Sequence, residues 1–169
     1  YEVVHNPMTM YMTADDVFAL SEPDVSMEVS DWGVFVGREA VKYQFEVMMK
    51  EKTIGTMFIH TLATPCIVVA DDGKTARGTW KSPGFETQVD ANEVPRGFWC
   101  WGSYSCDFIK EPEGWKIWHM KWWRIFRCDY YKCWTDDWKN IMTGPPRIHH
   151  FETEPITFFH PYDRSEERR

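Results

Sequence analysis

The stretch WKIWHMKWWRIFR, residues Trp115 to Arg127, has large side chains at both alternating sets of positions of a strand. A run of the same kind, FWCWGSYSCDFIK, precedes it from Phe98 to Lys110, and only EPEG, residues 111–114, separates the two. Two such runs joined by a short turn predict an antiparallel hairpin. An ordinary half-exposed hairpin is polar on one side, so we expect this one to be covered on both sides and to form the centre of the fold.

The register of this hairpin decides which side chains share a face. A four-residue turn places Lys110 opposite Trp115, so that the numbers of paired residues sum to about 225. We interpret one face as the wall of a cavity, formed by Trp118, Trp122, Arg124, Phe126, Trp99, Trp101, Ser103, Ser105 and Asp107. The other face is expected to be covered by another layer or subunit, and carries Ile117, His119, Lys121, Trp123, Ile125, Cys100, Tyr104, Cys106 and Phe108.

The composition of the chain restricts its class and its partners. Its 169 residues suit one domain, and its net charge of −7, with no basic block outside the hairpin and the last few residues, argues against a nucleic-acid surface. No apolar run approaches the roughly 20 residues of a membrane span. Five cysteines, mostly inside apolar strands and without zinc-site spacing, predict buried thiols and a cytoplasmic location. The ten Trp indicate an aromatic-lined cavity, a buried interface between subunits, or both.

The order of the remaining elements predicts an α+β fold. We expect a first helix ending before Pro7, a second at 13–20 capped by Thr13, and a third opened by Gly37 over 38–50. Strands are predicted at 25–29, 33–36, 56–69 with a bend at Pro65, and 74–80. We interpret residues 81–97, which contain two prolines and two glycines, as a loop, and expect a last helix at 129–142.

Three parts of the chain resemble the SnoaL-like proteins of the nuclear transport factor 2-like superfamily. They are VSMEVSDWGVFVGREAVKYQF at 25–45, HTLATPCIVVADDGKTARGTW at 60–80 and WWRIF at 122–126. The resemblance implies a cone-shaped barrel in which a curved antiparallel sheet wraps around N-terminal helices. We therefore place the domain at 1–143, and expect a tail at 144–169 that packs on the domain or on a neighbouring subunit. This fold hosts enzymes of several classes and simple binding modules, so the reaction does not follow from it.

Within the superfamily, the chain is similar to scytalone dehydratase and the bile-acid dehydratases, which eliminate water without a cofactor. This similarity implies catalytic roles for His60, Arg124 and Tyr1. Asn6 stands where the bile-acid enzymes carry an aspartate that pairs with histidine, and Ala63 stands where their catalytic histidine falls. A second histidine of scytalone dehydratase would fall near Trp80. Either the chemistry differs from that of these enzymes, or another group completes the site.

The chemistry of elimination gives His60 and Arg124 defined roles. An elimination beside a carbonyl or phenol needs a base and a group that stabilises the oxyanion. His60 is the best base because an imidazole titrates near neutrality, although it could be a polar residue satisfied within a strand. Arg124 could hold an anionic oxygen in an apolar cavity, or could simply stack between Trp101 and Trp122.

Other polar residues give weaker candidates. Asn6 could replace the missing carboxylate, whereas Glu86 is expected to be solvated in its loop and Asp107 to pair with Arg124. The histidines of the tail lack fixed spacing, so we predict neither a metal nor a cofactor. We predict a substrate-binding set of mainly aromatic side chains: Tyr11, Trp80, Trp99, Trp101, Trp122 and Phe126.

The sequence therefore predicts a cofactor-independent lyase that acts on an aromatic or polycyclic hydrophobic small molecule. One alternative has the same pocket but a different reaction: a lyase that releases formaldehyde from a lignin-type phenolic dimer, or an isomerase. Another is a non-catalytic binding or oligomerisation module. A homodimer or homotrimer is expected because both faces of the hairpin are apolar.

Overall fold

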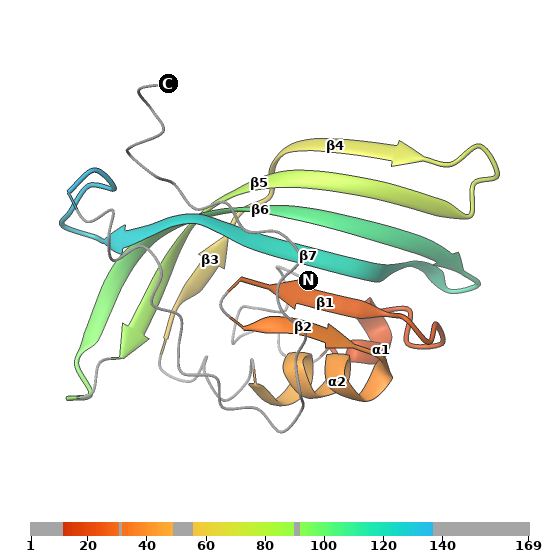
Figure 1. The fold of residues 1–169 in the computed structure, drawn as a ribbon, viewed down its shortest axis with the longest axis horizontal. Coiled ribbons are helices and arrows are strands. Elements are labelled where there is room, and N and C mark those ends of the chain that lie inside the picture. The colour runs from red at the N-terminus through yellow and green to blue at the C-terminus, as the bar shows by residue number, and fades with distance from the viewer. Residues whose placement is uncertain (1–11, 31, 49–55, 90–91, 137–169) are drawn as a thin grey trace.

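A curved sheet packed against short helices forms the body of the protein (Figure 1). The structure is a computed structural model, and it describes residues 12–30, 32–48, 56–89 and 92–136. The predicted first helix and tail lie outside these ranges. The described elements are α1 Ala14–Val17, β1 Ser26–Val29, β2 Gly33–Val36, α2 Arg38–Lys42, η3 Tyr43–Met48, β3 Phe58–His60, β4 Ala63–Val69, β5 Thr75–Val89, β6 Pro95–Glu111 and β7 Gly114–Asp129.

The strands form one sheet in the order β2-β1-β7-β6-β5-β3, with β4 also paired to β5. Only β1 and β7 run parallel among these pairs; the others are antiparallel. The long strands β5, β6 and β7 curve across the molecule, and the helices lie beside β1 and β2 (Figure 1). The α+β class and the curved sheet are confirmed, although β2 and β3 remain as separate edges and the sheet does not close into a barrel (Figure 1).

The predicted central hairpin is present, but its predicted register holds only near the turn. Lys110 pairs with Trp115 as expected. A bulge between Asp107 and Phe108 and another between Trp101 and Gly102 each shift the pairing by one residue. Because each bulge adds an unpaired residue to one strand, the side chains beyond it change faces. The predicted division of the hairpin into two faces is therefore wrong beyond the first bulge.

The structure corrects two further predictions of secondary structure. Residues 81–97 are not a loop over the sheet, because β5 continues to Val89 and β6 begins at Pro95. The predicted helix at 129–142 is absent from its described part, which ends β7 and continues in turns to Asp136. The predicted strand at 56–69 is present as two strands, β3 and β4, and Pro65 falls at a break in the pairing of β4 with β5.

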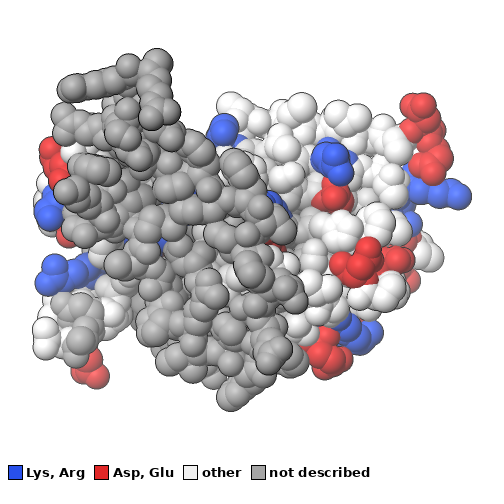
Figure 2. All heavy atoms as spheres, viewed as in Figure 1, with Lys and Arg blue, Asp and Glu red and all other residues white. Residues whose placement is uncertain are grey.

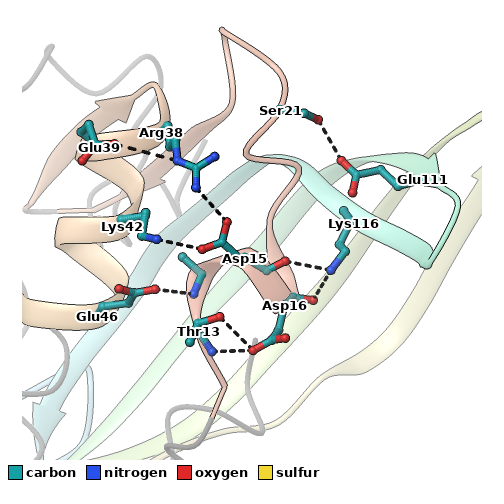
Figure 3. Close-up of polar contacts among 11 residues, drawn as sticks. Thr13, Asp15, Asp16, Ser21, Arg38, Glu39, Lys42, Glu46, Glu111 and Lys116 are labelled. Atoms are coloured by element: carbon teal, nitrogen blue, oxygen red, sulfur yellow. Dashed lines mark hydrogen bonds and ion pairs between the residues drawn. The ribbon is translucent and has the colours of Figure 1, made fainter.

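Helix α1 is short but well anchored (Figure 3). Thr13 caps it as predicted, and forms a capping box with Asp16. The Asp15 carboxylate forms ion pairs with two side chains of α2. Its oxygens lie 3.2 Å from Arg38 Nη2 and 2.8 Å from Lys42 Nζ. These contacts hold α1 against α2. Exposed pairs of this kind contribute little stability, so the apolar side of α1 supplies most of the packing energy.

The principal core lies between the helices and the inner face of the sheet. Phe18, Met27, Phe35 and Val41 are at most 1% exposed, and they belong to one buried cluster together with Tyr104 and Trp122 from the long strands. The helices therefore cover the same face of the sheet that carries Tyr104 and Trp122. A second, smaller cluster contains Phe126, Cys128 and Trp99.

The surface gives two further observations. On the described part of the face in Figure 2, acidic and basic side chains are interspersed, with acidic groups at the end where the β4–β5 turn lies. None of the helices in the described ranges has the length and apolarity needed to cross a membrane.

Candidate functional site

The site lies on the inner face of the sheet, where β3, β5, β6 and β7 are neighbouring strands. His60 of β3 pairs with Gly84 of β5, Gly84 pairs with Cys100 of β6, and Cys100 pairs with Arg127 of β7. Directly paired residues of antiparallel strands project from the same face of a sheet. The register therefore brings His60, Cys100 and Arg127 to one level. Glu86 lies two residues beyond Gly84, on the same face of β5.

A buried histidine and a buried glutamate form the centre of this site. His60 Nε2 lies 3.2 Å from Glu86 Oε1, and the two side chains are only 6% and 5% exposed. The His60 ring also meets the Trp122 ring edge to face, with centroids 5.4 Å apart. A carboxylate accepts hydrogen bonds, so this pairing favours the tautomer that carries its proton on Nε2 and its lone pair on Nδ1.

Two arginines keep the glutamate ionised. Burial by itself would raise the pKa of Glu86, but the hydrogen bond from His60 and the positive charges of Arg124 and Arg127 outweigh burial and hold this pKa well below its usual range. Arg127 Nη1 lies 3.4 Å from Glu86 Oε2, and the Arg127 guanidinium also lies over the Phe98 ring. Glu86 therefore remains a carboxylate throughout the neutral range.

Arg124 brings a second positive charge to the same face. Arg124 is 4% exposed, and its guanidinium carbon lies 5.4 Å from the centre of the Trp122 ring. The backbone N–H of Arg124 donates a hydrogen bond to Ser30 Oγ at 2.9 Å, which ties β7 to the end of β1. With one carboxylate facing two guanidinium groups, the site has a net positive charge and suits an anionic oxygen.

Glycines make room for this arrangement at two levels of the sheet. A Cβ on Gly84 would lie 2.3 Å from the Ile59 carbonyl oxygen, so only glycine allows β3 to approach β5 as closely as it does. A Cβ on Gly102 would lie 2.7 Å from Trp122 Nε1. The indole of Trp122 therefore lies flat against the strand between Tyr104 and Cys100.

Cys100 lies close enough to His60 and Glu86 to raise the question of a metal. One ligand atom from each of the three residues lies within 4.8 Å of the others. Burial and the negative charge of Glu86 raise the pKa of the Cys100 thiol well above its usual value, although Arg124 opposes the shift. A cation would also have to compete with both arginines for Glu86. The charges therefore favour an anion over a metal ion at this site.

The structure places four of the predicted site residues on the inner face of the sheet and three others on the opposite face. His60, Arg124, Trp122 and Trp80 project from the inner face, where Trp80 pairs with Tyr104. Trp99, Trp101 and Phe126 project from the opposite face, because the bulge between Asp107 and Phe108 places Trp99 and Trp101 there and the bulge beside Trp101 adds Phe126. Their predicted place in the wall of the cavity was wrong. The predicted residues Tyr1, Asn6 and Tyr11 lie outside the described part of the chain.

The opposite face of the sheet has its own features. The rings of Trp101 and Phe126 stack with their centroids 5.9 Å apart, and Trp101 is 43% exposed. Asp107 was predicted to share the face of Arg124, but it lies on the opposite face. It binds Arg77 at 2.7 Å and His119 at 3.3 Å near the surface. His119 lies away from the site, as expected.

Sequence reasoning missed the partner of His60. Glu86 was expected to be solvated, but it is 4% exposed and ion-paired, and Arg127 had no predicted role. The available signal was the alternation from Ser82 to Val89. Small or polar residues at even positions alternate there with apolar or β-branched residues at odd positions, which indicates a strand that continues through Pro83.

An open curved sheet over N-terminal helices, with a polar site buried on its inner face, defines a protein of the nuclear transport factor 2-like class. The SnoaL-like domain model matches residues 11–121, and the chain belongs to this family. No curated protein matches the chain significantly.

Solved structures of low sequence identity share the fold. The alignment with LinA covers 86% of this chain and 86% of LinA, with a TM-score of 0.59 and 9% sequence identity. A candidate scytalone dehydratase from Novosphingobium aromaticivorans covers 88% of each chain, with a TM-score of 0.56 and 17% identity. The chain spans 66% of a candidate dehydratase from Streptomyces avermitilis, which covers 58% of this chain with a TM-score of 0.48 and 21% identity. At these identities the likeness to LinA and to the Novosphingobium aromaticivorans protein establishes the fold alone.

Proposed function

We propose that this protein is a cofactor-independent lyase that eliminates a small leaving group by proton abstraction. One observation carries the proposal: a buried imidazole, His60, is paired with a buried carboxylate, Glu86, at 3.2 Å. A carboxylate behind an imidazole fixes the orientation of the ring and stabilises the positive charge that it gains as a base. Glu86 thus takes the place of the aspartate whose absence at Asn6 left the sequence pattern incomplete.

The proposed reaction balances without an external oxidant or reductant. Nδ1 of His60 takes a proton from the carbon beside a carbonyl, and the electrons of that C–H bond pass toward the carbonyl oxygen. Arg124 stabilises the negative charge that develops there. The electrons then form a carbon–carbon double bond as the β-carbon loses its hydroxyl group. The imidazolium returns its proton to this leaving group, so water departs and His60 regains its original state.

The choice of substrate rests on the aromatic side chains of the inner face. Trp80, Tyr104 and Trp122 lie there, and the rings of His60 and Trp122 meet edge to face. Flat aromatic side chains suit a ring compound, so we propose an aromatic or polycyclic substrate. The names of two structural neighbours, a candidate scytalone dehydratase and a hexachlorocyclohexane dehydrochlorinase, agree with elimination from a ring. An isomerase would use the same base and return the proton to a different carbon.

Elimination of water from 3-hydroxy-1-tetralone tests the proposal, because the resulting enone tautomerises, by moving a proton from C4 to the carbonyl oxygen, to 1-naphthol, which is followed by its absorbance. Removal of a general base typically costs about 100-fold to 10,000-fold in rate, so His60→Gln should lose turnover to that extent. His119→Gln is the matched control, since His119 also contacts a carboxylate but lies on the outer face. Equal turnover in wild type and His60→Gln contradicts the proposal.

Binding measured on the same proteins separates a lyase from a binding module. A lyase should retain affinity for 1-naphthol in His60→Gln while losing turnover. If the wild type binds 1-naphthol and converts no β-hydroxyketone of this kind, the non-catalytic alternative is favoured.

A further inference from the structure

A fully buried glutamine lies in the helical layer that packs on the inner face of the sheet. Gln44 is 0% exposed, and within the described part of the chain neither atom of its side-chain amide has a hydrogen-bond partner. It lies in η3, a π-helix that continues α2. Isolated π-helical turns are rare and occur frequently at functional sites. A buried amide without partners is costly, so it calls for an explanation.

Gln44 belongs to the layer that packs against the inner face of the sheet. Its buried neighbours along the helix, Val41, Phe45 and Met48, are members of the same core cluster as Tyr104 and Trp122. The Phe45 ring meets that of Phe18 edge to face at 5.5 Å, which fixes this turn of the helix. The amide of Gln44 is therefore held on the sheet side of the helix rather than in solvent.

Two more buried polar atoms of the inner face share this property. Ser82 Oγ and Trp122 Nε1 are also without hydrogen-bond partners among the described residues. Both flank Gly102: Ser82 is its cross-strand partner, and Trp122 Nε1 lies 2.7 Å from the position that a Cβ of Gly102 would occupy. Ser82 and Trp122 thus place two polar groups beside each other, one step along the sheet from the pair formed by His60 and Glu86.

We propose that Gln44 and Trp122 bind oxygen substituents of the substrate, so that the site selects oxygenated ring compounds over halogenated ones of the same shape. The proposal rests on the proposed function in treating the inner face as a small-molecule site. An indole N–H can only donate, and an amide can both donate and accept. Hydroxyl and carbonyl oxygens satisfy both, whereas a carbon-bound chlorine is a poor acceptor and leaves these groups unpaired.

This selectivity follows from the asymmetry of buried hydrogen bonding. A site built to bond a ligand oxygen rejects an analogue that lacks it, because the buried polar groups are then left without partners. An apolar pocket, by contrast, discriminates poorly between isosteric groups. The dehydrochlorinase named among the structural neighbours shares the fold, and the proposal therefore predicts a difference in ligand preference from that enzyme.

A matched pair of ligands tests the proposal: 1-naphthol and 1-chloronaphthalene, which differ in one substituent. Titration calorimetry on the full chain should show 1-naphthol binding about tenfold more tightly, the factor that one neutral hydrogen bond supplies. Gln44→Met keeps the volume of the side chain and removes its polar atoms. It should reduce the preference for 1-naphthol several-fold, while 1-chloronaphthalene binds as tightly as before or more tightly.

Two further variants keep the test decisive. Gln88→Met makes the same exchange at the chain's other glutamine, which is half-buried on β5, and should leave the preference unchanged. Trp122→Phe removes only the indole donor and should also reduce the preference, so the test does not depend on Gln44→Met folding. Equal affinity of wild type for the two ligands, no binding of either, or an unchanged preference in both Gln44→Met and Trp122→Phe overturns the proposal. The preference can hold without any turnover, and that result would refute the proposed lyase alone.

Discussion

Replacing Glu86 by glutamine removes one buried charge and almost nothing else. Glutamine has the shape of glutamate, and its amide oxygen can still accept a hydrogen bond from His60 or Arg127. The substitution therefore isolates the contribution of the negative charge. In the wild-type protein that charge faces His60 at 3.2 Å and Arg127 at 3.4 Å, and it lies in the field of Arg124.

The expected cost is large because the partners are buried. The side chains of Arg127 and Glu86 are 3% and 5% exposed, so water cannot replace the lost carboxylate. Removing one member of a buried ion pair costs about 3–5 kcal/mol, since the remaining charge is left uncompensated. Asp107→Asn is the matched control: Asp107 also contacts one arginine and one histidine, but Arg77 is 72% exposed. An exposed pair contributes about 0–1 kcal/mol, so this control should lose little.

Urea unfolding at several pH values measures both quantities. The pKa of Glu86 is lowered in the folded protein from its ordinary value of 4.5, so its contribution is fully present above that value and is lost as the pH falls through the folded-state pKa. The difference between wild type and Glu86→Gln should thus stay constant from about pH 8 to pH 5 and shrink only in stronger acid. A difference at pH 7 below about 1 kcal/mol, or one no larger than that of Asp107→Asn, would refute the buried charge network.

The close approach of β3 to β5 gives a second prediction: Gly84→Ala forces a Cβ to within 2.3 Å of the Ile59 oxygen and should cost about 1–3 kcal/mol of unfolding free energy. Gly97→Ala, where the nearest atom would be 3.6 Å away, should cost much less, and equal losses in thermal unfolding would count against the close approach of the two strands. Burial raises the pKa of the Cys106 thiol to about 12, so iodoacetamide at pH 9 should label exposed Cys66 and spare Cys106 in the native protein. Mass spectrometry of the labelled peptides checks this, and equal labelling of both would show that the inner face is open.

The central hairpin could be predicted from sequence, because alternation and turn length are local signals, whereas the inward placement of Arg124 was expected partly from the family resemblance. The bulges could not be predicted, since no residue type marks where one strand gains a residue over its partner. The bulge between Asp107 and Phe108 was enough to place Trp99 and Trp101 on the face opposite Arg124, and the bulge beside Trp101 moved Phe126 to that face. Assignments of strand faces from alternation are thus reliable only between bulges.

The partner of His60 was missed for a different reason. Pro83 and Gly84 are typical of a loop, but here they lie inside β5. On one edge of that strand, β4 pairs as far as Lys81 and β3 begins to pair at Gly84, so Pro83 falls in the gap between them and its missing N–H costs no bond there. The glycine admits the backbone of β3. Only this tertiary arrangement explains both residues, and it also buries Glu86.

Nuclear magnetic resonance of the imidazole nitrogens shows whether Glu86 holds His60 in the orientation of a base. The His60→Gln variant assigns the signals. At pH 8, we expect a His60 ring protonated on Nε2 alone, with Nδ1 carrying the lone pair, and the loss of this fixed tautomer in Glu86→Met, which removes the acceptor of the Nε2 proton. A ring protonated on Nδ1, a ring protonated on both nitrogens at this pH, or signals unchanged in Glu86→Met would refute this role of Glu86.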